Sequence, residues 1–407
     1  MKIAILKERR PHETRVAASA ETIKKFLDLG AEVCVEKDAG KGSSMPDAVF
    51  KEAGATIAAS AADAVEGAEI ILKVQRPMIS GEKQDELSIL SSGQSLVCQM
   101  NALTDNDFVA AMGEAGITGF AMELMPRISR AQSMDVLTSQ SNLAGYKAVL
   151  DAASEFGRAF PMMMTAAGTV PPARVLVMGA GVAGLQAIAT ARRLGAIVSA
   201  TDVRAATKEQ VESLGATFLA VEDEEFVQGQ TSGGYAKEMS EAYQAKQSAL
   251  IAESIRKQDI VICTALIPGR QAPKLIDAKM VASMAPGSVI VDLAAESGGN
   301  CALSQVDRVI QKNGVKIVGH ANTAGRLAID ASRLFAKNLL NFLTPLIDQK
   351  NGAFNIDMDD ETVSGTLITR GGEIVHPLLK KSAEPPITGL SDEVSEESSE
   401  KASAIAD

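Results

Sequence analysis

The stretch that decides the fold is RVLVMGAGVAGLQAIATARRLGAIVSATDVR, residues 174–204 of the 407-residue chain. Its first five residues are a buried-strand run, 182–194 has helical spacing, and 197–201 reads as the next strand. The turn between the first strand and the helix, Gly179-Ala180-Gly181-Val182-Ala183-Gly184, matches G-x-G-x-x-G, and Asp202 ends the second strand. In this strand–turn–helix–strand context the motif predicts a dinucleotide-binding unit.

Each residue type in this unit has a physical reason. Gly179 permits the tight turn, Gly181 lets the backbone approach a pyrophosphate, and Gly184 lets the helix pack close to the strand. The start of the helix then offers unpaired N–H groups to the phosphates. Asp202 is expected to accept hydrogen bonds from the ribose hydroxyls and to repel a 2′-phosphate, which favours NAD(H). Arg204 could instead bind a 2′-phosphate. A further alternative is a Rossmann fold that binds no cofactor.

Short β-rich runs alternate with helical runs on both sides of this unit. Strands are expected at 2–6, 32–36, 70–74, 95–99, 118–121, 217–220, 259–264, 288–292 and 316–318, and helices at 19–29, 46–52, 105–115, 141–156, 208–214, 246–257 and 328–343. This alternation predicts an α/β protein of two Rossmann-like, doubly wound parallel-sheet domains with a nucleotide cleft between them. The expected domains are 1–140 with 326–381, then 141–325 as the NAD(H)-binding domain, and 382–407 as a disordered acidic tail.

Composition narrows the class of protein. The chain is 46% hydrophobic and 22% charged, which excludes a collagen, a coiled coil and wholesale disorder. With no Trp, 3% aromatic residues and a net charge of −11, a nucleic-acid partner is not expected. Four cysteines without C-x-x-C spacing are expected to be reduced thiols in the core. No signal peptide, membrane-spanning segment or metal site is recognised, so we expect a soluble protein that could still dock on a membrane partner.

The regular pattern breaks between residues 221 and 244. The segment EDEEFVQGQTSGGYAKEMSEAY, residues 222–243, is polar and acidic and contains a Gly-Gly pair. Connections of this kind normally run to about 2–6 residues. The insertion is therefore a functional flap, a disordered segment or a tolerated surface loop.

Candidates for acid–base chemistry are few. A dehydrogenase that acts on a hydroxy or amino acid needs a positioned acid or base, often His, and a cation for the substrate carboxylate. The chain has three histidines, His12, His320 and His376. Their sequence surroundings fit structural or surface positions better than a catalytic one.

Three further stretches, together with the Rossmann unit, carry a family resemblance. KERRPHETRVA at 7–17, KVQRP at 73–77 and VDLAAESGGN at 291–300 resemble the alanine dehydrogenase / NAD(P) transhydrogenase superfamily over roughly residues 1–380. Alanine dehydrogenases keep a Lys, a His and an Asp at three positions of these signatures. This chain has Gln75, either Gln99 or Asn101, and Glu296 there, whereas Arg15 is kept. The losses argue against an amino-acid dehydrogenase.

The closer resemblance is to the NAD(H)-binding α subunits of proton-translocating NAD(P) transhydrogenase. It is carried by PRISRAQSMD at 126–135 and by Gly233-Gly234-Tyr235. The resemblance implies that Arg127 and Asp135 hold the carboxamide end of the nicotinamide, that Gln132 reaches toward a partner, and that Tyr235 closes over the nucleotide. The catalytic residues implied are Arg127, Gln132, Asp135 and Tyr235. The cofactor-binding residues implied are Arg127, Ile128, Ser129, Arg130, Gln132, Thr138 (where Ser is common), Gly179, Ala180, Gly181, Val182, Gly184, Asp202, Val203, Arg204, Gly234, Gln247 and Leu266.

The function that this resemblance implies is hydride transfer between NADH and NADP⁺ bound on a partner domain or subunit. Such a transfer needs orientation and exclusion of water but no general acid. A membrane-spanning subunit would couple the transfer to proton translocation, the chain would form a homodimer, and it would lie on the cytoplasmic side of the inner membrane through its partners. Two alternatives stay open. One is a stand-alone amino-acid dehydrogenase that uses Arg15 and Lys73 for the carboxylate, and the other is a nucleotide sensor that signals through residues 221–244.

Overall fold

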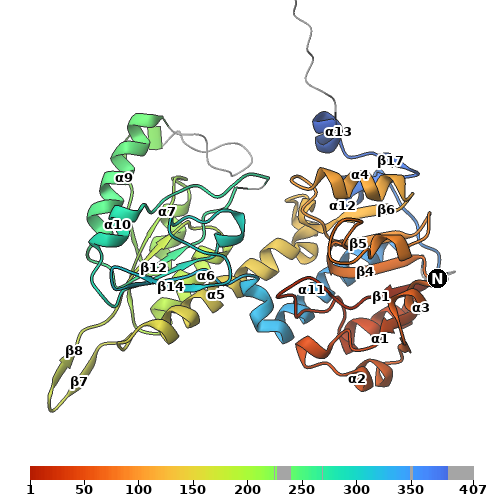
Figure 1. The fold of residues 1–407 in the computed structure, drawn as a ribbon, viewed down its shortest axis with the longest axis horizontal. Helices are drawn as coiled ribbons and strands as arrows, with labels where there is room; N and C mark the ends of the chain where they lie inside the picture. The colour runs from red at the N-terminus through yellow and green to blue at the C-terminus, as the bar shows by residue number, and fades with distance from the viewer. Residues whose placement is uncertain (224, 227–239, 268, 349–351, 384–407) are drawn as a thin grey trace, which may run out of the picture.

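A computed structural model of the chain describes residues 1–223, 225–226, 240–267, 269–348 and 352–383. It has two α/β lobes side by side, each built on its own sheet (Figure 1). Two long helices lie between the lobes (Figure 1). The predicted fold class, two doubly wound sheets in which most strands are parallel, is confirmed.

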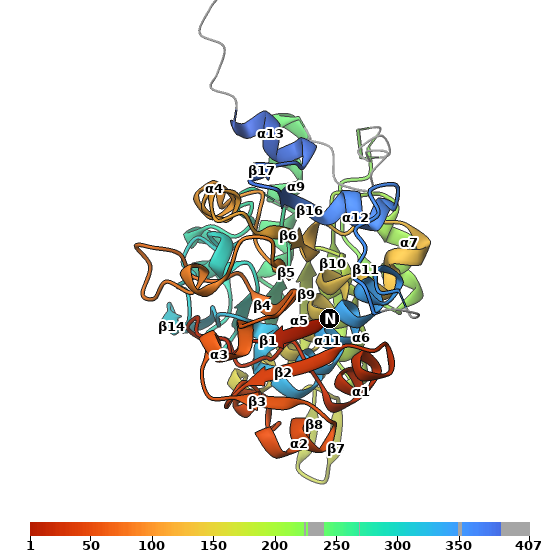
Figure 2. The same cartoon turned by 90° about the vertical axis from the view of Figure 1, so that its right-hand side faces the viewer.

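The first lobe holds an eight-stranded sheet in the order β17-β16-β6-β5-β4-β1-β2-β3, which runs from top to bottom in Figure 2. Its strands are β1 (Lys2–Ile5), β2 (Glu32–Glu36), β3 (Thr56–Ala58), β4 (Ile70–Gln75), β5 (Ser95–Gln99), β6 (Thr118–Ala121), β16 (Leu367–Arg370) and β17 (Glu373–Ile374). The first six are parallel, while β16 and β17 add an antiparallel edge. The parallel strands are mostly apolar because helices cover both faces of such a sheet.

The second lobe holds a seven-stranded sheet in the order β11-β10-β9-β12-β13-β15-β14. Its strands are β9 (Arg174–Met178), β10 (Ile197–Thr201), β11 (Thr217–Phe218), β12 (Ile260–Cys263), β13 (Val289–Asp292), β14 (Val309–Lys312) and β15 (Val315–Val318). Only β14 runs antiparallel to its neighbour. A separate hairpin of β7 (Met163–Thr165) and β8 (Gly168–Val170) projects away from this lobe (Figure 1).

The helices follow the strands along the chain, and several of them start at polar caps that the sequence supplies. The helices are α1 (Ala20–Asp28), α2 (Asp47–Glu52), α3 (Ala61–Val65), α4 (Asn106–Glu114), α5 (Val136–Glu155), α6 (Val182–Arg193), α7 (Thr207–Ser213), α9 (Glu241–Ile255), α10 (Ala278–Ser283), α11 (Ala328–Leu343), α12 (Glu361–Thr366) and α13 (Pro377–Ala383). Ser19 and Thr22 form a capping box on α1, and Asp105 and Asp135 cap α4 and α5. These caps satisfy backbone N–H groups that would otherwise lack partners.

The two lobes are joined by α5 and α11. Helix α5 crosses α6 of the second lobe so closely that a Cβ on Gly145 would lie 2.0 Å from the carbonyl oxygen of Ala183. Asp151 of α5 pairs with both Lys147 and Arg326, and Arg326 lies in the 3₁₀ turn η6 (Thr323–Leu327) before α11. Helix α11 packs in turn against α5 and α1. The lobes are therefore connected by packed helices rather than by loose linkers.

The structure corrects several expected boundaries. Helix α5 begins at Val136 instead of residue 141, because Asp135 accepts the Thr138 N–H and starts it. Helix α9 begins at Glu241 instead of residue 246, capped by Ser240. The short elements β3, β7, β8, β14, β16 and β17 were not predicted, since runs of two to four residues give no clear period. The four cysteines are buried free thiols, as expected, while the exact domain boundaries stay a prediction.

Candidate nucleotide site

The glycine-rich turn joins β9 to α6 beside β12, where the strand order of the second sheet reverses. Gly179 has a φ of +102°, and the Thr264 hydroxyl donates to its carbonyl oxygen at 2.9 Å. A Cβ on Gly184 would lie 1.8 Å from that same oxygen, so a larger residue does not fit. A Cβ on Gly181 would meet no protein atom within 4 Å, so this glycine leaves space that a ligand can enter. Within the described part of the chain no side chain caps α6, and its first N–H groups are available to an anion.

Asp202 lies directly behind this turn. It follows β10, is 9% exposed, and accepts the Ala180 N–H at 2.7 Å. Arg204 is turned back onto the same carboxylate, with its Nε at 2.9 Å from Oδ1 and its Nη2 at 2.8 Å from Oδ2. The hydrogen bonds with Asp202 raise the pKa of Arg204. Arg204 thus has an internal carboxylate partner in this structure, on the side of the turn where a ribose hydroxyl would bind.

Two other predicted contacts lie around the turn. Gln247 donates to the Thr201 hydroxyl at 2.8 Å and accepts the Val221 N–H at 3.0 Å, so it ties the end of β10 to the start of the 221–244 segment. Leu266 is 53% exposed on the loop after β12. Gly234 and Tyr235 lie outside the described residues.

The loop after β12 is held by a residue that sequence reasoning did not single out. The buried Asn300 side chain donates to the carbonyl oxygens of Ala265 and Pro273 at 2.9 Å and accepts the Ala265 N–H at 3.1 Å. Asp292 holds Asn300 in turn, because its carboxylate accepts the Asn300 N–H at 3.2 Å. The VDLAAESGGN signature was recognised from sequence, but its role in supporting this loop becomes visible only in the fold.

The other predicted site residues lie in the first lobe, before and at the start of α5. Arg127 and Gln132 are exposed, and Ile128 packs against the core of this lobe. Asp135 is half-buried, and its Oδ2 accepts the Thr138 hydroxyl at 2.5 Å. These side chains are spread over the short 3₁₀ helix η4 (Ser129–Met134) and its flanks.

Helix α5 shows how far the 127–138 segment lies from the glycine-rich turn. Gly145 touches Ala183 beside the turn, and it lies nine positions after the first residue of α5, Val136. At 1.5 Å per residue the loop lies about 13 Å along the helix from the contact with α6. The fold thus brings the glycine-rich turn and the 127–138 segment to one helix.

The corresponding position in the first sheet is filled by charged side chains. At the strand-order reversal between β1 and β4, Lys73 lies 3.1 Å from Glu86 and 3.4 Å from Glu8, and all three side chains are buried. Burial, with a smaller effect from the charges of Glu13 and Glu86, raises the pKa of Glu8 to about 7 despite the opposing charge of Lys73. Arg9 pairs with Glu86 as well. At the position where the second lobe has its glycine-rich turn, the first lobe therefore has buried ion pairs.

A second buried cluster lies where the chain passes between the lobes. Arg15 forks onto Glu13, with Nε to Oε1 at 2.8 Å and Nη2 to Oε2 at 2.6 Å. Burial alone would raise the pKa of Glu13, but the charge and hydrogen bonds of Arg15 lower it. Gln75 and Asn322 each donate to Glu13 at 3.1 Å, and the Asn322 N–H donates to Glu296 at 2.8 Å. Asn322 thus connects the first lobe with the signature loop of the second.

Among the described residues, no histidine pairs with a nucleophilic side chain that it could activate as an acid or base. His12 is 48% exposed and faces Asp307 at 3.4 Å. Burial lowers the pKa of His320 and of His376, which favours neutral rings at physiological pH. His376 lies against the Gly365 carbonyl oxygen at 3.2 Å, in a structural position.

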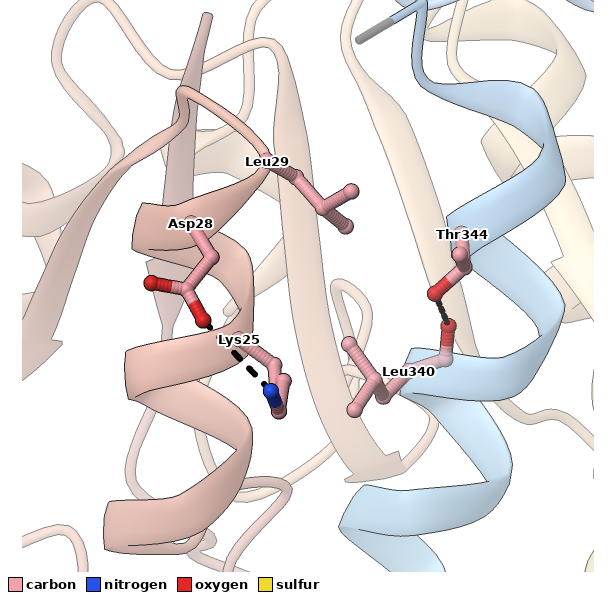
Figure 3. A pocket seen from close by; sticks show the side chains of 5 residues that line it. All are labelled: Lys25, Asp28, Leu29, Leu340 and Thr344. Atoms are coloured by element: carbon pink, nitrogen blue, oxygen red, sulfur yellow. Dashed lines mark hydrogen bonds and ion pairs between the residues drawn. The ribbon is translucent and has the colours of Figure 1, made fainter.

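A surface hollow lies elsewhere. Figure 3 shows it between α1 and α11, lined by Lys25, Asp28, Leu29, Leu340 and Thr344, with a volume of about 380 Å³. Lys25 pairs with Asp28 at 3.5 Å, and the Thr344 hydroxyl donates to the Leu340 carbonyl oxygen at 2.7 Å. None of the predicted site residues lines it, so we assign it no role.

Two doubly wound sheets, one with a glycine-rich turn backed by a buried aspartate, define a dinucleotide-binding protein of the Rossmann class. Family models agree: "Alanine dehydrogenase/PNT, N-terminal domain" matches residues 4–144, and "Alanine dehydrogenase/PNT, C-terminal domain" matches residues 148–377. A Rhodospirillum rubrum protein, the first part of its NAD(P) transhydrogenase subunit alpha, is 61% identical over 379 residues, which cover 93% of this chain and 99% of that protein. The chain belongs to the alanine dehydrogenase/PNT family, and within it to the α subunits of NAD(P) transhydrogenase.

Solved structures agree with this assignment. The crystal structure of a transhydrogenase from Sinorhizobium meliloti superposes with a TM-score of 0.83 at 53% identity, covering 92% of this chain and 100% of that one. An L-alanine dehydrogenase superposes with a TM-score of 0.77 at 24% identity, covering 94% and 98%, and shows the shared fold. The resemblance read from sequence is confirmed. Family membership implies a nicotinamide-nucleotide-binding oxidoreductase that works with partner subunits.

Proposed function

We propose that this chain binds NADH and presents it for hydride transfer to NADP⁺ held by a separate domain or subunit. The observation that carries the proposal is the glycine-rich turn tied to the buried Asp202. A carboxylate at the end of β10 accepts ribose hydroxyls and disfavours a 2′-phosphate, which supports NAD(H) over NADP(H). The open space at Gly181 supports close approach of a pyrophosphate.

The roles of the remaining site residues follow from this assignment. Bound NADH would supply the hydride. Arg127 and Asp135 would orient the carboxamide end of the ring, and the exposed Gln132 would reach the NADP(H)-binding partner. Tyr235 would close over the nucleotide and exclude water. No proton is released or consumed at the reacting carbons, so the arrangement needs orientation rather than an acid or base.

The stand-alone dehydrogenase is less well supported. It would need Arg15 and Lys73 to bind a substrate carboxylate, but both cations are buried and already paired with carboxylates of the chain. A ligand that displaced Glu13 from Arg15 would leave a buried carboxylate without its partner, at a cost of several kcal/mol. The sensor function depends on residues 221–244, most of which lie outside the described residues.

Three measurements distinguish these functions. The purified chain should shift NADH fluorescence on binding, show no turnover of NADH with pyruvate and ammonia, and transfer hydride only after an NADP(H)-binding transhydrogenase component is added. Turnover with pyruvate and ammonia would favour the dehydrogenase. Tight NADH binding without transfer to the added component would favour the sensor.

Coupling to proton translocation would take place in a membrane-spanning partner subunit. In the described residues no helix is both long and apolar enough to cross a bilayer. We propose a peripheral position on the cytoplasmic side of the inner membrane, reached through the partner. Co-purification of the chain with a membrane fraction only when that subunit is present would test this placement.

We also propose that the chain is a homodimer. The projecting β7–β8 hairpin carries Met162, Met163 and Met164, which are 58%, 42% and 80% exposed. Consecutive exposed methionines on an arm are costly to leave in water and suit burial against a second copy. Light scattering should give twice the chain mass, and replacing the three methionines by serine should shift the protein toward monomer. A monomeric wild-type chain would refute the dimer.

A further inference from the structure

The loop around η4, residues 127–138 (called the η4 loop below), is held by hydrogen bonds from α11, in the part of the chain that returns to the first lobe. Two side-chain amides of α11 converge on one carbonyl oxygen: Asn338 donates to Ser133 O at 2.8 Å and Asn341 donates to it at 2.9 Å. Asn338 is 7% exposed, and its own carbonyl oxygen accepts the Ser139 hydroxyl at 2.7 Å. Because both ends of this buried amide have partners, its orientation is determined.

The start of the loop is held by an ion pair. The Arg130 guanidinium forks onto Asp360, with Nη1 to Oδ2 at 3.0 Å and a second contact from Nη2 to Oδ1. The side-chain hydrogen bonds of Arg130 hold the pKa of Asp360 well below its ordinary value. Asp360 is also the N-cap of α12, where it accepts the Thr362 N–H at 2.7 Å. A planar fork of this kind sets direction as well as distance.

Between these two attachments lies Gln132. A six-residue 3₁₀ helix has poor internal hydrogen-bond geometry and does not hold its own shape well. Ala131 and Met134 anchor η4 in the apolar core of the first lobe. Apolar contacts are not directional, so they set the depth of the loop but not its rotation. The hydrogen bond that Asn338 donates to Ser133 and those that Asp360 accepts from Arg130 provide the direction.

We propose that Asn338 and Asp360 are positioning residues for hydride transfer, which fix the rotation of the η4 loop and thereby aim Gln132 and Arg127. This inference rests on the proposed function of the loop. Arg130 then attaches the loop to Asp360 through their ion pair, in addition to any contact that it makes with the nucleotide. Neither Asn338 nor Asp360 touches the reacting atoms.

The substitution Asp360→Asn tests the fork in isolation. Asn caps a helix about as well as Asp, so α12 keeps its start, while the charged fork is lost. Asp359→Asn is the matched control because it removes the same charge from the adjacent, exposed position. The second test, Asn338→Asp, keeps an acceptor for Ser139 and replaces the donor to Ser133 by a carboxylate oxygen.

Three readouts are needed: the NADH dissociation constant, the transfer rate at saturating NADH with an NADP(H)-binding component, and hydrogen–deuterium exchange of residues 127–138. We expect both test variants to slow transfer about tenfold or more, since small misplacements near reacting groups cost up to about a hundredfold. The NADH dissociation constant should change less than about threefold, and exchange in 127–138 should rise. Because Arg130 is half-exposed, solvent screens the pair, so the melting temperature of Asp360→Asn should lie only slightly below that of Asp359→Asn.

The outcomes separate the positioning role from the proposed function. An unchanged transfer rate at saturation, or a rate that falls only in parallel with NADH binding, would overturn the positioning role. Absence of transfer by the wild-type chain would overturn the proposed function. In that case the exchange experiment still decides whether Asn338 and Asp360 hold the loop. Unchanged exchange in both variants would show that they do not.

Discussion

Replacing Asp202 by Ala should reverse part of the preference for NADH over NADPH. The carboxylate has two roles that the substitution removes together. It binds the turn through the Ala180 N–H at 2.7 Å, and it holds Arg204 through the backbone N–H, Nε and Nη2 at 2.8–2.9 Å. In the variant the 2′-phosphate of NADPH no longer meets a carboxylate, and the positive charge of Arg204 is no longer neutralised by Asp202.

The magnitude follows from these contacts. Two like charges about 4 Å apart near a protein surface repel by about 4 kcal/mol, and the neighbouring Arg204 and salt reduce this to about 2 kcal/mol. NADH also loses hydrogen bonds from its ribose to a charged acceptor, worth about 1.5 kcal/mol or more. Together the preference should shift by about 3.5 kcal/mol, or about three-hundredfold in the ratio of dissociation constants.

The assay is a pair of fluorescence titrations, with NADH and with NADPH, at one fixed ionic strength. Asp202→Asn is the matched control: it keeps the side-chain shape and an oxygen for the Ala180 N–H but removes the charge. It should recover NADH binding relative to Asp202→Ala while keeping most of the change in preference. A ratio that stays within about threefold of wild type in Asp202→Ala would refute the ribose role of this residue.

Substitutions at four other positions have definite expected results. Burial raises the pKa of Glu8 from 4.5 to about 7. The contribution of Glu8 to the free energy of unfolding, up to about 3 kcal/mol, is therefore fully present below pH 4.5 and is lost as the pH rises through 7. Glu8→Gln should flatten the fall of the melting temperature between pH 5 and 8, and parallel curves for the two proteins would exclude Glu8 as the titrating group. Asn322 has a φ of +44° and donates to Glu13, so urea unfolding should find Asn322→Ala less stable than Asn322→Gly by about 1 kcal/mol, with equal stabilities arguing against backbone strain. Gln132→Asn and Tyr235→Phe should slow hydride transfer more than they weaken NADH binding, and unchanged transfer in both would count against their roles.

Sequence alone was sufficient where the pattern is local. The strand 174–178, the turn and the helix beginning at residue 182 lie where the motif predicts, because each step depends on neighbours in the chain. The caps Ser19 and Asp105 start helices for the same reason. The family signatures also identified the transhydrogenase lineage, since they combine several short motifs in one order.

Sequence was insufficient where a contact joins distant segments. Nothing in the KERRPHETR stretch itself shows that Arg15 is buried on Glu13 or that Glu8 is buried beside Lys73, which β4 brings next to β1 in the sheet. No period or spacing in the chain reveals that Asp360 would reach Arg130, 230 residues earlier. The local sequence determined which elements form and that one of their turns suits a dinucleotide. Only the tertiary structure decided which charges are available to a ligand and which are neutralised within the protein, because burial and pairing depend on the partners that folding brings together.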